Sequence, residues 1–202
     1  MNDIRRHIPD DDGELVLAAR TGDLAAFELI VRKYQGRMLN VAFRITGVYE
    51  DACEVVQDAF VAAHRGLKDF RGESRFSTWL TAITANLARN RLEQLLTRRK
   101  NEALSLDDPL PTEDGDIMRE PPSTRPTPLE EVERLNVQEK VQGCIGELPP
   151  GFREVLVLRD LEEFSYGEIG AILKLRDGTV KSRLARAREA VKDCLKRAFG
   201  AL

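Results

Sequence analysis

Apolar residues in the first half of the chain recur at steps of three and four, the spacing that places side chains on one face of a helix. Seven of these positions predict one long amphipathic helix, with Asp23 placed to cap its start and Gly47 to end it. The seven positions are Phe27, Ile30, Val31, Tyr34, Met38, Val41 and Ile45. Because this part of the chain lacks strand-like alternation, we expect an all-α bundle.

Further helices are predicted on both sides of the long one. The apolar spacing continues from Ala52 to Ala63 and closes at Gly66. After the loop LKDFRGESRFS it resumes at Trp79 and runs to Leu87 or Leu95. A shorter helix is expected from Glu14 to Arg20. These segments complete the first predicted domain.

The second half of the chain predicts a helix-turn-helix preceded by two other helices. One helix is expected from Leu129 to Ile145, followed by a break at the two prolines after Leu148 and a helix from Phe152 to Arg159. Ser165 and Glu168 have the spacing of a capping box, so a new helix should start there. The last apolar pattern follows closely and comprises Val180, Leu184, Ala187, Val191 and Leu195. Two helices joined by such a tight turn form a helix-turn-helix.

Prolines and acidic residues separate the two halves. Between Ser105 and Glu133 lie nine acidic residues, two arginines and six of the nine prolines. Such a segment cannot sustain long helices or bury a core. We therefore expect an all-α protein with two small helical domains, residues 1–100 and 129–202, joined by an extended acidic, proline-rich linker over residues 101–128. Two roles remain open for this linker: it is either a plain spacer or a functional element.

Composition indicates a soluble globular protein, since 42% of the 202 residues are hydrophobic and 32% are charged. No apolar run approaches the length of a membrane span, and the N-terminus lacks the apolar core of a signal peptide, so we expect a cytoplasmic protein.

The three cysteines, Cys53, Cys144 and Cys194, lie far apart without a CxxC pair, and only His7 and His64 could supply imidazole ligands beside them. We therefore expect no zinc site. Each cysteine lies in a helical apolar pattern, which favours small core residues or inert thiols over a redox role.

Charge is segregated along the chain, whose formal net charge is -3. Between Lys174 and Arg197 lie nine basic and three acidic residues, a local net charge of +6. With the apolar side chains of this helix turned inward, its outward faces carry Thr179, Lys181, Ser182, Arg183, Ala185, Arg186 and Arg188. A basic helix alone is often only a solvated surface, but a helix-turn-helix places its second helix in the major groove of DNA. The pattern therefore predicts DNA binding.

A second group of residues suited to nucleic acid begins in the loop before the third helix. Aromatic rings and a guanidinium come together at Phe70, Arg71, Phe76 and Trp79, and the polar residues Asn86, Arg89 and Asn90 follow on one helix. Aromatic rings beside basic groups suit unstacked, single-stranded bases. By their spacing Phe76 and Trp79 could equally be core residues, so both interpretations stay open.

These features together resemble the bacterial extracytoplasmic-function sigma factors, the compact branch of the sigma-70 family that directs RNA polymerase to promoters. The resemblance to region two of the family runs through ARTGDLAAFELIVRKYQGRMLNVAFRITG, DACEVVQDAFVAAHRGLKDFRG and FSTWLTAITANLARNR. The resemblance to region four runs through LPPGFREVLVLRDLEEFSYGEIGAIL and DGTVKSRLARAREAVK. It implies a non-enzymatic subunit without catalytic residues, metal ligands or cofactor.

The resemblance implies three contact surfaces. The helix that docks on the clamp helices of the largest polymerase subunit would carry Asp51, Glu54, Val55, Gln57, Asp58 and Phe60. The minus-ten element would be melted and held by Phe70, Arg71, Phe76, Trp79, Asn86, Arg89 and Asn90. The minus-35 element would be contacted by Arg176, Thr179, Lys181, Ser182, Arg183, Arg186 and Arg188. Judged without the resemblance, Gln57 and Asp58 could be an ordinary solvated face.

The implied partners are core RNA polymerase, including the flap of its second-largest subunit, promoter DNA and an anti-sigma factor. The anti-sigma factor, often membrane-anchored, could hold the chain at the inner membrane, and the linker would run toward the RNA exit path. The alternative is an autonomous helix-turn-helix regulator that binds duplex operator DNA without polymerase. A third alternative, an interaction scaffold that does not contact DNA, conflicts with the basic helix. The aromatic group suits single-stranded bases, so it favours a sigma factor over the autonomous regulator.

The chain departs from the family pattern at four positions. Cys53 replaces a common acidic residue, Gly170 a common alanine and Lys174 a common glycine, while Arg176 stands at the expected N-cap of the last helix. We therefore expect weaker capping of that helix. Asp177 in its first turn can compensate through the helix dipole.

Overall fold

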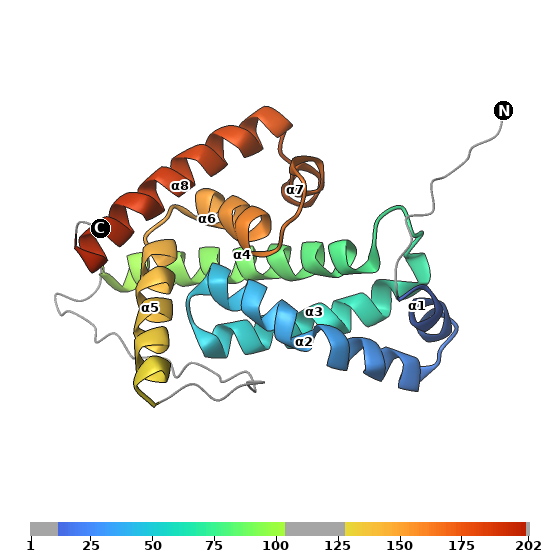
Figure 1. The fold of residues 1–202 in the computed structure, drawn as a ribbon. Helices are drawn as coiled ribbons and strands as arrows, with labels where there is room; N and C mark the ends of the chain where they lie inside the picture. Colours follow the sequence, from blue (N-terminus) through green and yellow to red (C-terminus); the bar gives the residue numbers. More distant parts are fainter. Residues whose placement is uncertain (1–11, 104–127, 201–202) are drawn as a thin grey trace.

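All regular structure in the described part of the chain is helical (Figure 1). The computed structural model describes residues 12–103 and 128–200. The first stretch contains α1 (Gly13–Arg20), α2 (Leu24–Thr46), α3 (Tyr49–Gly66), the short 3-10 turn η1 (Leu67–Asp69) and α4 (Phe76–Ala103). The second contains α5 (Pro128–Gly146), α6 (Pro150–Leu156), the π-helical turn η2 (Val157–Leu161), α7 (Tyr166–Leu173) and α8 (Asp177–Phe199). Residues 104–127 of the predicted linker lie outside the described part.

The helix ends form where local sequence signals place them. The Asp23 carboxylate accepts hydrogen bonds from the backbone N–H groups of Ala25 (2.9 Å) and Ala26 (3.1 Å) at the start of α2. Gly47 ends the same helix in the left-handed conformation, at φ +81°. Ser165 and Glu168 form the predicted capping box of α7. These predictions are confirmed.

Two helices differ from the prediction. The third long helix, α4, begins at Phe76 and continues to Ala103, so it is longer than the apolar pattern indicated at both ends. The helix after Pro149 widens into η2, where the N–H of Glu162 bonds to the carbonyl of Val157 at 3.1 Å. None of the helices in the described ranges combines the length and apolar character needed to cross a membrane.

The first stretch is a bundle of α2, α3 and α4, with α1 packed against α2 near its start (Figure 1). Its centre is apolar: Met38 of α2, Ala59 of α3 and Leu80 of α4 have no exposed surface. Burial of a large apolar side chain stabilises the fold by about 1.5–3 kcal/mol. This packing holds α3 and α4 rigidly, which matters for the surfaces that they present.

The second stretch lies over α4 as a further layer. Figure 1 shows α6 between α4 and α8, with α7 at one end of α8. Val155 of α6, Ile169 of α7 and Val180 of α8 are completely buried. The buried residues of the two stretches form one continuous apolar cluster. The sequence predicted the two helical units but not this contact between them.

The Arg153 guanidinium of α6 lies where the two stretches meet. It donates to the carbonyl of Ile45 at the end of α2 (2.7 Å), to that of Gly146 at the end of α5, and to that of Leu148 (3.3 Å). Carbonyls at helix ends have no partner within the helix, so a guanidinium there satisfies them. Burial lowers the pKa of Arg153 from its usual value. One buried cation thus joins the ends of two helices from different halves.

The sequence favoured small core residues or inert thiols at all three cysteine positions, but two of the cysteines are bonded to each other. Cys144 of α5 and Cys194 of α8 form a disulfide, and only Cys53 is free among the cysteines. This pairing could not be predicted, because the two cysteines are 50 positions apart and an apolar pattern does not show which helices contact each other. Both side chains are buried, so their placement in apolar patterns was interpreted correctly and their chemistry was not.

Candidate nucleic-acid interface

The start of α8 presents a basic and polar face on the outside of the second stretch. Lys181, Ser182 and Arg186 are exposed, while Val180 and Leu184 of the same helix are buried against the other helices. Two residues precede this face: Arg176, which is exposed, and Thr179, which is half-buried. In Figure 1 α8 lies along the edge of the molecule farthest from α2 and α3. The face is therefore open to a long, charged ligand.

Two arginines predicted for the same face have structural partners. Arg188 pairs with Asp160 through two contacts, Nε to Oδ2 at 2.9 Å and Nη2 to Oδ1 at 2.5 Å. Arg183 is half-buried, and its guanidinium lies so close to Gly151 of α6 that a Cβ there would approach it to 2.7 Å. These contacts fix α8 to α6 and η2. Lys181 and Arg186 are exposed in the middle of the predicted site, and the Lys181 amine lies 5.6 Å from the centre of the Tyr166 ring.

The turn between α7 and α8 contains two of the departures from the family pattern. Lys174 adopts the left-handed conformation, at φ +54°, where glycine is usual because a Cβ is disfavoured there. Gly170 lies against this turn, and its carbonyl accepts a hydrogen bond from the N–H of Leu175 at 2.9 Å. Arg176 is the N-cap of α8 and makes no side-chain capping bond, so the expected weaker capping is confirmed.

Replacement of Gly170 with alanine should destabilise the protein, although alanine normally favours a helix. The new Cβ would lie 2.8 Å from the carbonyl oxygen of Leu175 and 3.3 Å from Oδ1 of Asp177, so the turn must shift. We expect a loss of about 1–2 kcal/mol of unfolding free energy, measured by urea denaturation. Gly167 of the same helix has open space at its Cβ position and supplies the matched alanine control. Equal stability of the two variants would contradict the close contact.

The aromatic residues predicted for single-stranded DNA form one cluster at the start of α4. The ring centroids of Phe70 and Trp79 are 5.0 Å apart, and those of Phe76 and Trp79 are 5.6 Å apart. Phe76 is completely buried, so it packs the bundle and has no surface for a base. Trp79 is half-buried, with its ring close to Gly66 of α3, and Arg71 is exposed. The cluster thus offers Phe70, Trp79 and Arg71 to a ligand.

The middle of α4 faces the second stretch. Nε of Arg89 donates to Oε1 of Glu154 at 2.8 Å, and the Glu154 side chain is only 4% exposed. Burial raises the pKa of Glu154, and the ion pair with Arg89 opposes that rise. Asn86 is half-buried and Asn90 is exposed. In this arrangement α6 covers part of Arg89, whose side chain is 26% exposed.

The residues predicted for polymerase docking divide into an inner and an outer group. Val55 and Phe60 are buried in the bundle. Nη2 of Arg91 on α4 contacts Oδ1 of Asp51 (2.6 Å) and Oε2 of Glu54 (2.7 Å). The hydrogen bond to Asp51, helped by the nearby carboxylates, raises the pKa of Arg91. Because these contacts fix α3 to α4, the exposed Gln57 and Asp58 stand on a rigid helix.

Comparison with known proteins matches both stretches. Residues 30–99 match the family described as Sigma-70 region 2, and residues 138–191 match Sigma-70, region 4. The chain is 34% identical to the RNA polymerase sigma-H factor of Pseudomonas aeruginosa, covering 92% of this chain and 94% of the relative. It is 36% identical to the ECF RNA polymerase sigma-E factor of Escherichia coli, covering 89% and 92%.

Solved structures share the fold. CnrH, solved in complex with the cytosolic domain of CnrY, has a TM-score of 0.64 and 28% identity, covering 93% of this chain and 99% of that one. The sigma factor RpoE from Bartonella quintana, solved with the anti-sigma factor NepR, has a TM-score of 0.61 at 22% identity, covering 84% and 96%. The chain therefore belongs to the extracytoplasmic-function sigma factors of the sigma-70 family, and it is a non-catalytic RNA polymerase subunit that directs transcription initiation.

Proposed function

We propose that the exposed part of α3 around Gln57 and Asp58 docks on the clamp helices of core RNA polymerase, in the cytoplasm where polymerase and chromosome meet. The ion pairs of Arg91 support this proposal, because they join α3 to α4 through Asp51 and Glu54, without a direct contact to Gln57 or Asp58. Preorganised polar groups on a rigid helix bind with a smaller entropy cost than mobile ones. Residues 1–100 would form the polymerase-docking and minus-ten domain, residues 101–128 the linker and residues 129–202 the minus-35 domain.

The minus-35 element would be bound by the exposed face of α8, and the segregation of charge on this helix carries the proposal. Lys181 and Arg186 face outward, whereas Val180 and Leu184 hold the helix on α6 and α7. Arg and Lys side chains on such a helix reach guanine edges and phosphates in the major groove. Arg183 and Arg188 would instead hold the helix in place through their contacts with α6 and η2.

Replacement of Arg186 with alanine should weaken promoter binding by roughly 5- to 150-fold, the equivalent of about 1–3 kcal/mol for an arginine that reads a base. The measurement is the affinity of the protein with core polymerase for a promoter fragment, at fixed salt. Arg197 near the end of α8 is the matched control, because its replacement removes the same charge from the same helix outside the proposed face. Equal losses from both replacements would point to a general charge effect and contradict a specific contact.

The minus-ten element would be held by Phe70, Arg71, Trp79 and Asn90, with Arg89 and Asn86 added once α6 moves away. The partial cover over Arg89 supports this proposal of an opening step, since its partner Glu154 is only 4% exposed and Arg89 itself is 26% exposed. We propose an anti-sigma factor as a further partner, which would act on this equilibrium. The structural neighbour from Bartonella quintana was solved in complex with an anti-sigma factor.

Opening can be followed by energy transfer between fluorophores at two exposed sites, Glu28 on α2 and Asp193 on α8. We expect transfer to fall when core polymerase binds. Replacement of Glu154 with glutamine should lower transfer in the free protein, because the partly buried Arg89 then loses its charged partner. Replacement of exposed Glu147 with glutamine is the control and should leave transfer unchanged. Constant transfer on binding polymerase would contradict the opening step.

A further inference from the structure

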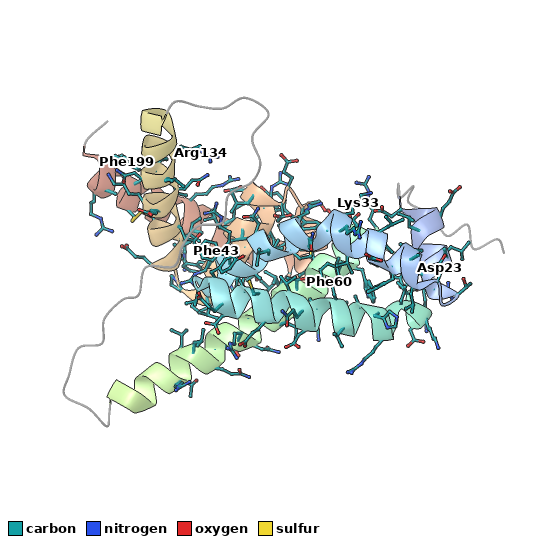
Figure 2. All side chains as sticks on the ribbon, turned by 90° about the horizontal axis from the view of Figure 1, so that it is seen from below. Asp23, Lys33, Phe43, Phe60, Arg134 and Phe199 are labelled. Atoms are coloured by element: carbon teal, nitrogen blue, oxygen red, sulfur yellow. A yellow bond between two sulfur atoms is a disulfide. The ribbon has the colours of Figure 1, made fainter. Side chains whose placement is uncertain are left out.

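The second stretch contains a cysteine pair that promoter binding does not use. Cys144 lies in the last turn of α5 and Cys194 in the C-terminal part of α8, and their sulfur atoms are bonded to each other. Their Cα atoms are 5.7 Å apart, within the range that disulfides usually span. Figure 2 shows the end of α8, marked by Phe199, beside α5.

The bond is the strongest contact described between these two helix ends. Arg197 and Glu147 form an ion pair at 3.3 Å, but both side chains are largely exposed, at 75% and 64%. The Lys140 amine lies 4.7 Å from the centre of the Phe199 ring, which is also at the surface. Exposed pairs of this kind contribute little to stability. The position of the end of α8 on α5 therefore depends largely on the state of the cysteines and on nearby apolar packing.

The bond also encloses the whole DNA-binding unit. Cys144 and Cys194 are 50 positions apart, and the segment between them includes α6, η2, α7 and most of α8. A cross-link that closes a long loop restricts the unfolded chain and so stabilises the folded one. Oxidation of the two thiols should therefore stabilise the half of the protein that reads the minus-35 element.

The cellular setting makes a permanent bond at this place unusual. If the chain works with polymerase in the cytoplasm, as proposed above, small thiols surround it, and disulfides of cytosolic proteins are usually transient. Both cysteines are buried, at 3% and 7% exposure, but they lie near helix ends flanked by the exposed residues Gly143 and Asp193. Helix ends open locally more readily than helix centres, so a small thiol can reach the sulfurs.

We propose that Cys144 and Cys194 form a reversible thiol–disulfide pair, and that its oxidation by a low-molecular-weight disulfide such as glutathione disulfide stabilises the DNA-binding half of this sigma factor. The bond joins α5 to α8, and most of the helix-turn-helix lies between the two bonded cysteines in the sequence. The proposal depends on the cytoplasmic function for its setting, but its chemistry and its stability effect can be measured without polymerase or DNA.

The exchange balances in two steps. In reduction, the thiolate of one small thiol attacks one sulfur of the pair, the Cys144–Cys194 bond breaks, and the other cysteine leaves as a thiolate that takes up a proton. A second small thiolate then attacks the mixed disulfide, which releases the first cysteine and a small disulfide. Two electrons pass from the two small thiols to the protein. Oxidation is the reverse, with the small disulfide as oxidant.

The test uses the purified full chain, equilibrated in buffers of stepwise glutathione to glutathione disulfide ratio. Thiols are trapped with a maleimide of known mass and counted by mass spectrometry, and the melting temperature is measured for each sample. We expect three thiols in the most reducing buffers and one in the most oxidising, with Cys53 as the remaining thiol. The oxidised form should melt roughly 5–15 °C above the reduced form.

Each cysteine variant has a defined outcome. Cys53→Ser should retain the full difference in melting temperature, whereas Cys144→Ser and Cys194→Ser should each abolish it. The wild-type comparison of oxidised and reduced protein decides the question even if a serine variant folds poorly. Free thiols at Cys144 and Cys194 in every buffer would overturn the pair. A bond that glutathione never reduces would overturn its reversibility, and equal melting temperatures would overturn the stabilisation. Loss of promoter binding alone would concern the proposed function instead.

Discussion

Replacement of Arg153 with alanine should lower the free energy of unfolding by about 3–5 kcal/mol, since hydrogen bonds to a charged group are lost and buried carbonyls are left without partners. The guanidinium bonds to the carbonyls of Ile45, Gly146 and Leu148, which come from both halves of the protein. For a chain of this length the melting temperature should fall by roughly 10 °C. Calorimetry on the purified chain gives this value directly.

Two matched replacements separate the role of Arg153 from its charge. Arg153→Lys keeps the positive charge but lacks the planar fork that contacts two helix ends, so it should recover only part of the stability. Arg32→Ala removes a guanidinium from an exposed ion pair with Glu28, where we expect about 0.5 kcal/mol or less. An Arg153→Ala variant as stable as Arg32→Ala would show that the two halves do not depend on this contact.

Replacement of Phe76 with alanine should cost about 3–5 kcal/mol, the usual effect of removing a buried aromatic side chain. Phe76 has no exposed surface and contacts Tyr34 of α2 as well as Phe70 and Trp79. We expect the bundle of α2, α3 and α4 to lose helical content on mild heating, as measured by circular dichroism. Promoter opening would be lost as a consequence of unfolding.

The Trp79→Ala variant should behave differently because Trp79 is half-buried. We expect it to stay folded at moderate temperature but to open the minus-ten element poorly, since a stacked base is worth roughly 1–3 kcal/mol. Unpaired thymines in the promoter, detected by permanganate, measure this opening. If Trp79→Ala unfolds the bundle as Phe76→Ala does, the ring belongs to the core and should be removed from the proposed DNA surface.

Local features of this chain could be predicted from its sequence because their signals lie within a few residues. Asp23 caps the backbone N–H groups that immediately follow it, and Ser165 and Glu168 cap one another across a single turn. The apolar spacing also placed Val180 and Leu184 inward and Lys181 outward. Helical periodicity determines which face is buried, and a helix-turn-helix is built from neighbouring segments.

Contacts between distant segments could not be predicted in this way. Arg153 and Ile45 are 108 positions apart, and Arg89 and Glu154 are 65 positions apart. Hydrophobic periodicity shows that a helix has a buried face, but it does not show which helix covers it. One signal in the sequence does indicate such contacts: the charged pair Arg153-Glu154 lies inside the apolar run FREVLVL. Charged residues are seldom buried without partners, so both residues should contact distant parts of the chain.

Co-elution with core bacterial RNA polymerase on size exclusion tests most directly whether this chain acts as a polymerase subunit through α3. The wild-type chain should elute with the polymerase, and a Gln57→Ala, Asp58→Ala double variant should elute mostly free. A control variant, Glu28→Ala at an exposed position of α2, should bind normally. Failure of the wild-type chain to associate, together with tight binding to duplex DNA without polymerase, would contradict docking through α3 and favour an autonomous DNA-binding regulator.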